Sequence, residues 1–186
     1  MKKIITTLIL VLFLASCSTS SKTQENVSSV QKVEKTYFDI NIPSKWTLID
    51  NSSKTLPTPK SWEIVLAWSS NETTSWFSNN ILILSQDLYK PITSKDFSVV
   101  NNVWSTKDYV NYEKLDEKTI DFQDKDSSTL YIFEAKYNVS TPLFKYLQVW
   151  KVCNYKKAYL ITIALSSDVK NTTDYEDMLK SFTCKE

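Results

Sequence analysis

The sequence predicts an α+β domain, in which an antiparallel sheet of about six or seven strands is flanked by helices as an α/β/α sandwich. Three observations predict it. Segments with β-branched, aromatic or alternating apolar residues recur between residues 37 and 165. Short polar links join the last strand segments, which favours antiparallel hairpins because parallel strands need long crossovers. Two other stretches carry apolar residues at helical spacing.

The first part of the predicted sheet comprises four strand segments. The stretch YFDINIP (37–43) alternates apolar and polar residues and ends at a proline, and WTLI (46–49) follows it. WEIVLAW (62–68) and NILILSQDL (80–88) are rich in β-branched and aromatic residues. The polar stretch SSNETTSWFSNN between these two strands is predicted to be a loop.

A change of period predicts the first helix. Thr93 or Ser94 can cap it, and four apolar residues follow at helical spacing: Phe97, Val100, Val103 and Trp104. Strand signals then return at residues 112–122, 129–139, 143–153 and 158–165.

The last predicted element is a closing helix. Thr173 and Glu176 have the spacing of a capping box. One face of this helix carries Tyr175, Met178, Leu179 and Phe182. The helix is therefore expected to pack on the sheet.

The N-terminus has the features of an export signal. Lys2 and Lys3 precede an apolar run of eleven residues, 4–14, which is too short to span a bilayer. Leu14-Ala15-Ser16-Cys17 resembles the lipobox of bacterial lipoproteins. The resemblance implies that residues 1–16 are removed, and that Cys17 carries a diacylglycerol on its sulfur and becomes an acylated N-terminus. The alternative is an unlipidated secretory signal with a chance cysteine.

Residues 17–35 are predicted to be the lipidated cysteine and a flexible tether, because the stretch is polar and lacks aromatic residues. Val27, Val30 and Val33 recur every third residue, so a short helix is the alternative. The folded domain is then expected to occupy residues 36–186. These boundaries imply a protein held at the extracytoplasmic face of a bacterial membrane, at the cell surface or in the periplasm.

Two cysteines are left after lipidation. Cys153 ends a predicted core strand and Cys184 follows the closing helix. An even number of cysteines in an exported protein favours a disulfide, although two buried free thiols are the alternative. Closing this loop of about thirty residues would stabilise the fold by about 3 to 4 kcal/mol on the chain-entropy model.

Three stretches, IPSKWTLI, NYKKAYLITIAL and YEDMLKSF, together with a helix before the long meander, resemble the PsbP-like family over about 150 residues. That family includes the extrinsic photosystem II protein, Ran-binding relatives and bacterial lipoproteins. The resemblance implies a noncatalytic accessory or binding module. It transfers no active-site residues, because the family shares none. This chain departs from the usual pattern in having no glycine, so turns that need a left-handed residue must use another type, with Asn154 the first candidate.

The composition restricts the possible chemistry. The chain has no His and no Gly, which excludes a Ser/His/Asp triad and a glycine-rich phosphate loop. Asp121, Asp124 and Asp126 begin like a calcium loop, but position six lacks glycine and position twelve is Ala135. We therefore interpret this run as a solvated turn and predict no metal and no cofactor.

The acidic residues and the overall charge also bear on the possible functions. Glu63 and Asp87 lie on predicted strands and are the weak candidates for a carboxylate pair, against ordinary solvated charges. Removal of Lys2 and Lys3 takes the formal net charge from +1 to −1, and there is no Arg. A near-neutral domain without a basic stripe is not expected to bind nucleic acid.

Aromatic residues are the remaining candidates for a binding site. Trp76 and Phe77 lie in the predicted polar loop, where exposed rings suit contact with a partner or a sugar. The sequence thus favours a noncatalytic protein-binding or scaffold lipoprotein of the cell envelope, anchored to membrane lipid through Cys17. The alternative is a receptor for a small ligand or glycan that uses the aromatic loop.

Overall fold

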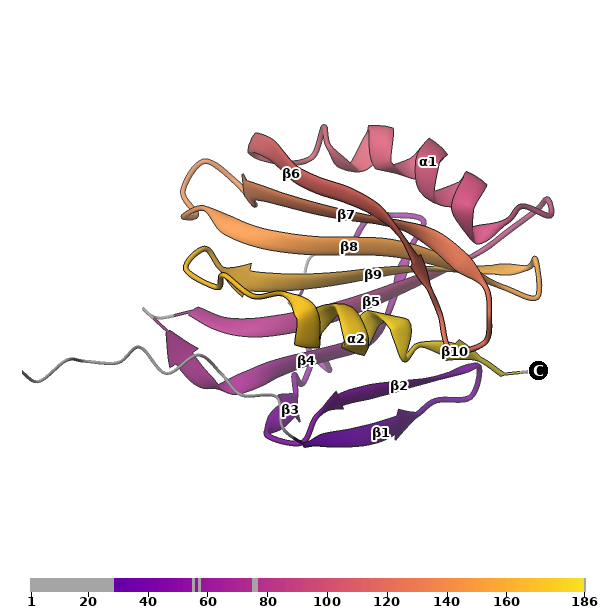
Figure 1. Ribbon diagram of the computed structural model, residues 1–186, viewed down its shortest axis with the longest axis horizontal. Coiled ribbons are helices and arrows are strands. Elements are labelled where there is room, and N and C mark those ends of the chain that lie inside the picture. Colours follow the sequence, from indigo (N-terminus) through magenta and orange to yellow (C-terminus); the bar gives the residue numbers. More distant parts are fainter. Residues whose placement is uncertain (1–28, 55, 57, 75–76, 186) are drawn as a thin grey trace, which may run out of the picture.

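The computed structural model describes residues 29–185 with gaps at 55, 57 and 75–76 (Figure 1). Cys17, the predicted lipidation site, and Trp76 lie outside the described residues. The elements form two antiparallel sheets and two helices in this part of the chain.

The large sheet has seven strands in the order β3-β4-β5-β9-β8-β7-β6. All of its neighbouring strands are antiparallel. The strands are β3 Trp46–Leu48, β4 Glu63–Thr74, β5 Phe77–Asp87, β6 Val110–Asp121, β7 Ser127–Lys136, β8 Phe144–Cys153 and β9 Lys157–Ser166. The long hairpins that the short polar links predicted are thus confirmed for β7, β8 and β9.

A small sheet has the order β1-β2-β10, with β1 Val30–Glu34, β2 Phe38–Pro43 and β10 Thr183–Cys184. Strand β1 pairs with β2 along its whole length, from Val30 opposite Pro43 to Glu34 opposite Asp39. The tether was predicted to run to Lys35, so the folded part begins earlier than the sequence suggested. The valine spacing at Val30 and Val33 belongs to a strand and not to a helix.

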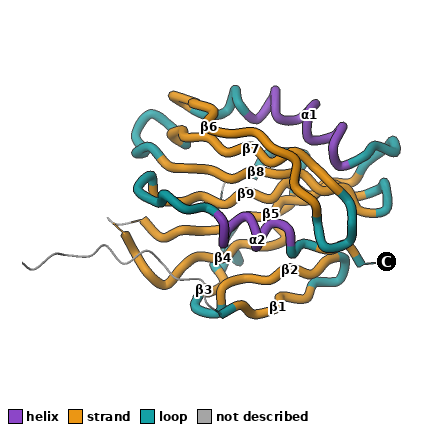
Figure 2. The backbone as a smooth tube through the Cα atoms, in the orientation of Figure 1, coloured by secondary structure: helices purple, strands orange, loops and turns teal. Residues whose placement is uncertain are grey.

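Helices α1 Ser94–Ser105 and α2 Thr173–Lys180 lie on opposite faces of the large sheet. Helix α1 packs on β7 and β8, and α2 contacts β8 and β2. In Figures 1 and 2, α2 crosses the near face of the sheet and the small sheet lies below it, whereas α1 runs along the β6 and β7 side. The predicted α+β class with helices on both sides is confirmed.

The two faces of the sheet have separate cores because side chains alternate along each strand. The covered face, under α2 and the small sheet, includes Ile81, Ile83, Leu147, Val149, Ile161 and Ile163, all buried. The open face, under α1, includes Tyr131, Phe133, Tyr146, Trp150 and Phe97. Successive residues of β5, β8 and β9 therefore serve different faces.

Both helices differ in detail from their predictions. At α1, Thr93 is the cap: the Asp96 amide donates to Thr93 Oγ1 at 3.1 Å, and Thr93 Oγ1 donates to the Asp96 carboxylate. Phe97 is buried, but Val100 and Val103 are exposed, because the helix packs through only part of the predicted apolar face. At α2 the cap position is Thr172, one residue before the predicted Thr173, and Thr172 Oγ1 donates to Glu176.

The stretch predicted as a polar loop, residues 69–80, is mostly strand. Strand β4 continues to Thr74 and β5 starts at Phe77, so the two form a long hairpin. Asn71, Glu72 and Thr73 are exposed. The buried residues of this stretch, Ser70 and Asn79, are polar, so no apolar alternation marks the strands in the sequence.

Strand β6 is one edge of the large sheet, and the three-residue β3 is the other. Charged side chains crowd β6: Glu113, Lys114, Asp116, Glu117 and Lys118. Its pairing with β7 shifts register twice, between Val110 and Glu113 and between Lys114 and Asp116.

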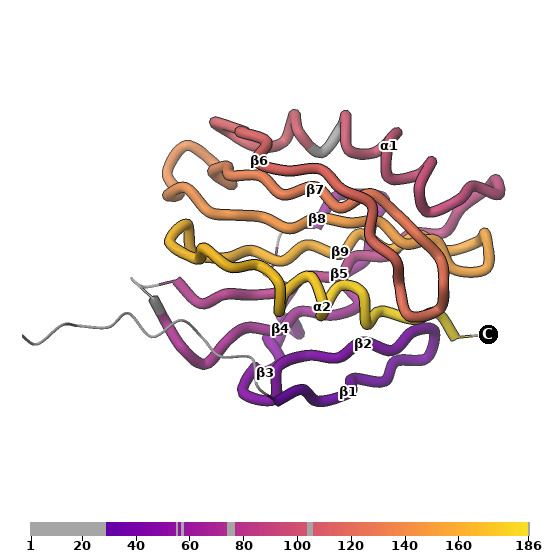
Figure 3. Tube along the Cα trace, viewed as in Figure 1, coloured from indigo at the N-terminus to yellow at the C-terminus, as the bar shows by residue number. Residues whose placement is uncertain are grey.

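Left-handed turn positions are filled without glycine. Asn154 has φ 51° and Tyr155 has φ 55°, which confirms the prediction at Asn154. Figure 3, coloured along the chain, follows this tight β8–β9 turn and the neighbouring C-terminus at the same end of the molecule.

Candidate functional site

A groove of about 680 Å³ lies on the open face of the large sheet. Its floor is formed by Leu82 and Leu84 of β5, Leu160 of β9, and Tyr146 and Gln148 of β8. Its lining also includes Thr58 and Pro59 from the segment before β4, and Asp108 and Tyr109 from the segment between α1 and β6. The groove thus draws on segments that are far apart in the sequence.

Strand alternation explains why this surface is hollow. On β9, Ile161 and Ile163 face the covered side, while Leu160, Thr162 and Ala164 face the groove. Thr162 and Ala164 are small, so they leave space above the sheet. Helix α1 packs on β7 and β8 and its Phe97 belongs to the open-face core, but the side chains described for α1 are not among the groove-lining residues.

Paired aromatic rings make up part of the groove lining. Phe77 stacks on Phe144 with ring centroids 4.1 Å apart. Tyr109 lies against Tyr146 and Phe133 at centroid distances of 4.9 and 5.1 Å. Because the rings hold one another, their faces and edges are offered to a ligand in fixed positions.

Gln148 is one of the polar residues that line the groove, together with Thr162 and Asn80. It is 2% exposed, and its Nε2 donates to Thr162 Oγ1 at 3.1 Å. Within the described part of the chain, its Oε1 accepts no hydrogen bond. A buried acceptor without a donor is uncommon and destabilises the free protein, so this atom is suited to a donor from a ligand.

The groove is otherwise nearly neutral. Burial raises the pKa of Tyr146, with a smaller contribution from Tyr137. Burial also raises the pKa of Tyr109; Tyr146 and Asp108 add to the effect, and the adjacent Gln148 amide opposes it. Both hydroxyls therefore stay protonated at neutral pH. Asp108 is exposed and is the charged residue among the described groove residues.

The structure describes one of the two aromatic residues that the sequence suggested for binding, Phe77 and Trp76. Phe77 is half-buried, packs against the open-face core and lines the groove. Trp76 lies outside the described residues. Their role in binding a partner stays a prediction.

A second polar cluster surrounds Lys151, which is 1% exposed. Its Nζ lies 2.8 Å from a carboxylate oxygen of Asp124 and 2.8 Å from one of Asp126, and 4.6 Å from the centre of the Phe122 ring. The Asp124–Asp126 run is the hairpin turn between β6 and β7, as interpreted from the sequence, but its two carboxylates also pair with Lys151, which was not predicted. The turn folds back and neutralises a buried ammonium from β8, a contact that local sequence cannot reveal.

Ser94 connects this cluster to α1. Its hydroxyl donates to Asp126 and accepts from the Val152 amide. Burial acts to raise the pKa of Asp124, but hydrogen bonds from Lys151 and the Cys184 amide outweigh it, so the pKa lies below its ordinary value.

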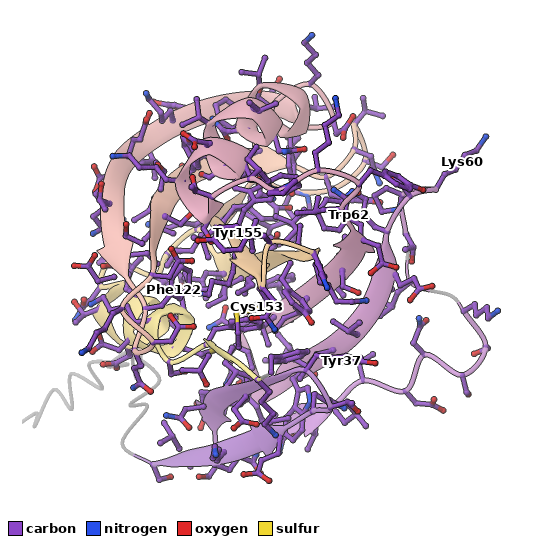
Figure 4. All side chains as sticks on the ribbon, turned by 90° about the vertical axis from the view of Figure 1, so that its right-hand side faces the viewer. Tyr37, Lys60, Trp62, Phe122, Cys153 and Tyr155 are labelled. Atoms are coloured by element: carbon purple, nitrogen blue, oxygen red, sulfur yellow. A yellow bond between two sulfur atoms is a disulfide. The ribbon has the colours of Figure 1, made fainter. Side chains whose placement is uncertain are left out.

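A disulfide joins Cys153 and Cys184, the pairing predicted from the sequence, with their Cα atoms 5.6 Å apart. It ties β10 to the end of β8. Figure 4 views the molecule from this end and shows Cys153, Tyr155 and Phe122. The cluster and the disulfide thus hold the C-terminal segment in place.

The two candidate carboxylates lie away from the groove. Asp87 forms an ion pair with Lys157 at 3.0 Å, and Glu63 lines a smaller cavity of about 250 Å³ beside Tyr159. Over the described ranges, no three His, Cys, Asp or Glu residues are grouped as metal ligands would be. In the same ranges, neither helix has the length and hydropathy of a membrane span.

No protein-family model and no curated protein matches this sequence. Among solved structures, the chain is similar to cyanobacterial PsbP (CyanoP) from Synechocystis, with a TM-score of 0.54 and 15% identity over 92% of this chain and 99% of that one. It is also similar to a Bacteroides thetaiotaomicron protein, with a TM-score of 0.47 and 6% identity over 80% of this chain and 45% of that one. The chain has the PsbP-like fold, as its motifs predicted.

Proposed function

We propose that this chain, with its PsbP-like fold, is a lipid-anchored extracytoplasmic protein that binds a small apolar ligand in the open-face groove. The observation that carries the proposal is the groove itself, a concave surface of about 680 Å³ with fixed aromatic rings. Small-molecule sites fall in the range of about 300 to 1,000 Å³ and are mostly apolar with few polar groups. A flat aromatic patch would instead have favoured a protein partner.

Membrane anchoring is supported by the lipobox-like sequence that ends at Cys17. The Cys153–Cys184 disulfide supports an oxidising compartment outside the cytosol. Acylation at Cys17 with more than one chain would hold the protein stably, because a single chain binds a bilayer only marginally.

Binding is favoured over catalysis by the nature of the groove lining. Its walls and floor are aromatic and aliphatic, and the candidate carboxylates Glu63 and Asp87 lie elsewhere. A hydrolytic pair needs two carboxyl groups on either side of the scissile bond, and among the described lining residues Asp108 is the one carboxylate.

A second candidate function, an envelope accessory module that binds a protein, is favoured by one specific surface. Val99, Val100 and Val103 on α1 are all more than half exposed. Adjacent exposed valines on one helix are suited to contact with a partner. This surface is separate from the groove lining, so the two candidates can be tested independently.

The test of the anchor is the mature chain purified from bacterial membranes. Intact mass is expected to give a protein that starts at an acylated Cys17, and Cys17→Ala is expected to move the protein out of the membrane fraction. An unmodified N-terminus on membrane-associated wild-type protein would reject the anchor.

The test of the groove is a fluorescence titration with N-phenyl-1-naphthylamine, a neutral apolar probe. Leu160→Trp fills the floor and is expected to abolish binding, while the α1 variant Val99→Lys/Val103→Lys is expected to bind normally. Unfolding curves establish that both variants are folded. Equal binding by wild type and Leu160→Trp, or binding lost only in the α1 variant, would move the site away from the groove.

A further inference from the structure

We infer that the groove selects an uncharged or cationic aromatic compound that carries an N–H or O–H group, and that Gln148 Oε1 accepts the hydrogen bond from this group. The inference rests on the proposed ligand-binding function and names the class of ligand. Three features of the groove carry it: one orphan acceptor, fixed rings and one negative charge.

The acceptor is held in place before any ligand arrives. The Gln148 side chain is 2% exposed, and its Nε2 is tied to Thr162 Oγ1 at 3.1 Å. Gln148 lines the groove, and its Oε1 is enclosed and accepts no hydrogen bond within the described residues, so a donor from a ligand reaches it once the side chains around it shift. A site built to hydrogen-bond a donor rejects analogues that lack it, because the buried polar atom is then left without a partner.

The rings favour a flat ligand. Phe77 and Phe144 form one aromatic pair, and Tyr109 and Tyr146 form another. The leucines of the floor make no directional contacts, so selectivity at the floor depends on the shape of the ligand and its packing against the rings. Aromatic pairs prefer offset or edge-to-face contacts, and a planar bicyclic ring is suited to two such walls.

The charge at the rim disfavours anions. Asp108 is a groove residue, and its carboxylate makes the smallest contribution, after burial, Tyr146 and Tyr137, to raising the pKa of the Tyr109 hydroxyl. The field of Asp108 therefore reaches the groove wall. An anionic ligand would meet this charge with no groove cation to offset it among the described residues.

Indole and benzofuran provide a matched test, because the two bicyclic rings have nearly the same shape and only indole has an N–H donor. Each compound is used to displace N-phenyl-1-naphthylamine from the full mature chain. Indole is expected to bind about fivefold to tenfold more tightly than benzofuran. Gln148→Met keeps the side-chain length and removes the acceptor, and is expected to bring the two affinities together.

A charge comparison completes the test. Tryptamine is expected to bind a few-fold more tightly than indole-3-acetate at low salt, and Asp108→Asn is expected to narrow this difference. The two comparisons on wild type need no variant, so they test the preference for a donor and against an anion even if Gln148→Met fails to fold.

The outcomes separate the inference from the proposed function. If indole and benzofuran bind wild type equally and Leu160→Trp loses both, the groove binds ligands but the donor rule is wrong. If neither compound displaces the probe from wild type, or if indole keeps its advantage in Gln148→Met, the assignment of Gln148 is overturned.

Discussion

Strand β8 carries two buried polar side chains, one on each face of the sheet, whose hydrogen-bonding groups are satisfied to different extents. Lys151, on the covered face, is met by two carboxylates and the Phe122 ring. Gln148, three residues earlier on the open face, has a partner for its Nε2 but none for its Oε1 within the described residues. The comparison indicates that the ion pairs of Lys151 stabilise the fold, while Gln148 Oε1 is left to accept a hydrogen bond from a ligand.

The largest expected effect compares neighbouring residues of β9. Ile161 is buried in the covered core, whereas Leu160 is only partly buried in the groove floor. Ile161→Ala is expected to lower the free energy of unfolding by about 2 to 5 kcal/mol, and Leu160→Ala by about 1 kcal/mol or less, because solvent already reaches that site. Urea unfolding of both variants measures the difference, and equal losses would remove the distinction between the faces.

The next effect concerns the buried ammonium. Asp124→Asn/Asp126→Asn removes both anionic partners of Lys151, a side chain that is 1% exposed. We expect a loss of about 3 kcal/mol, because a buried charge without its counterion is strongly destabilising. Adding Lys151→Met to the double variant is expected to restore most of the lost stability. If the free energy of unfolding of the double variant lay within about 1 kcal/mol of the wild-type value, the cluster would contribute little to stability.

A smaller effect is expected from acid. The pKa of Asp124 in the folded protein lies below the ordinary 3.8, since Lys151 and the Cys184 amide outweigh burial. The carboxylate therefore stabilises the fold above the unfolded value and loses that contribution as the pH falls through the folded value. The urea midpoint of wild type is expected to drop more between about pH 5 and pH 2.5 than that of Asp124→Asn. Parallel curves for the two proteins would contradict the shift.

The smallest expected change in stability is that of Gln148→Met, and this variant also tests whether Gln148 acts in binding and not in folding. Gln148→Met removes an acceptor that has no donor, so we expect unchanged stability or a gain of up to about 1 kcal/mol. The same variant is expected to lose its preference for indole, which would separate stability from binding at one residue. A loss of more than about 2 kcal/mol would show that the hydrogen bond to Thr162 matters more than the free Oε1.

Much of the fold could be predicted from the sequence because buried strands leave a periodic pattern. Alternation identified β2, strand-type segments including runs of β-branched and aromatic residues identified β4 to β9, and helical spacing located α1 and α2. The hairpin around Asn71 to Thr73 was missed because its side chains are exposed on both sides. The strand β1 was missed because its polar composition resembles a tether and its partner β2 supplies the order.

The candidate site was harder to predict, because it depends on contacts between distant segments. Phe77 was identified as an aromatic of interest, but its packing on Phe144, 67 residues later, was not visible in the sequence. Gln148 lies in a strand that is apolar on both faces, so nothing local distinguishes it from a core position. The pairing of Lys151 with Asp124 and Asp126 likewise required the sheet to bring them together.

The two edge strands of the large sheet determine whether copies of this protein at high local concentration can pair through their sheets and aggregate. A strand border with free backbone groups is a template for joining another chain into a continuous aggregate. Here one border, β6, carries charges of both signs and two shifts of register with β7, and the other, β3, is only three residues long. Neither border offers a long regular stretch for a second chain to pair with, so dense packing on a surface need not lead to fibrous assembly.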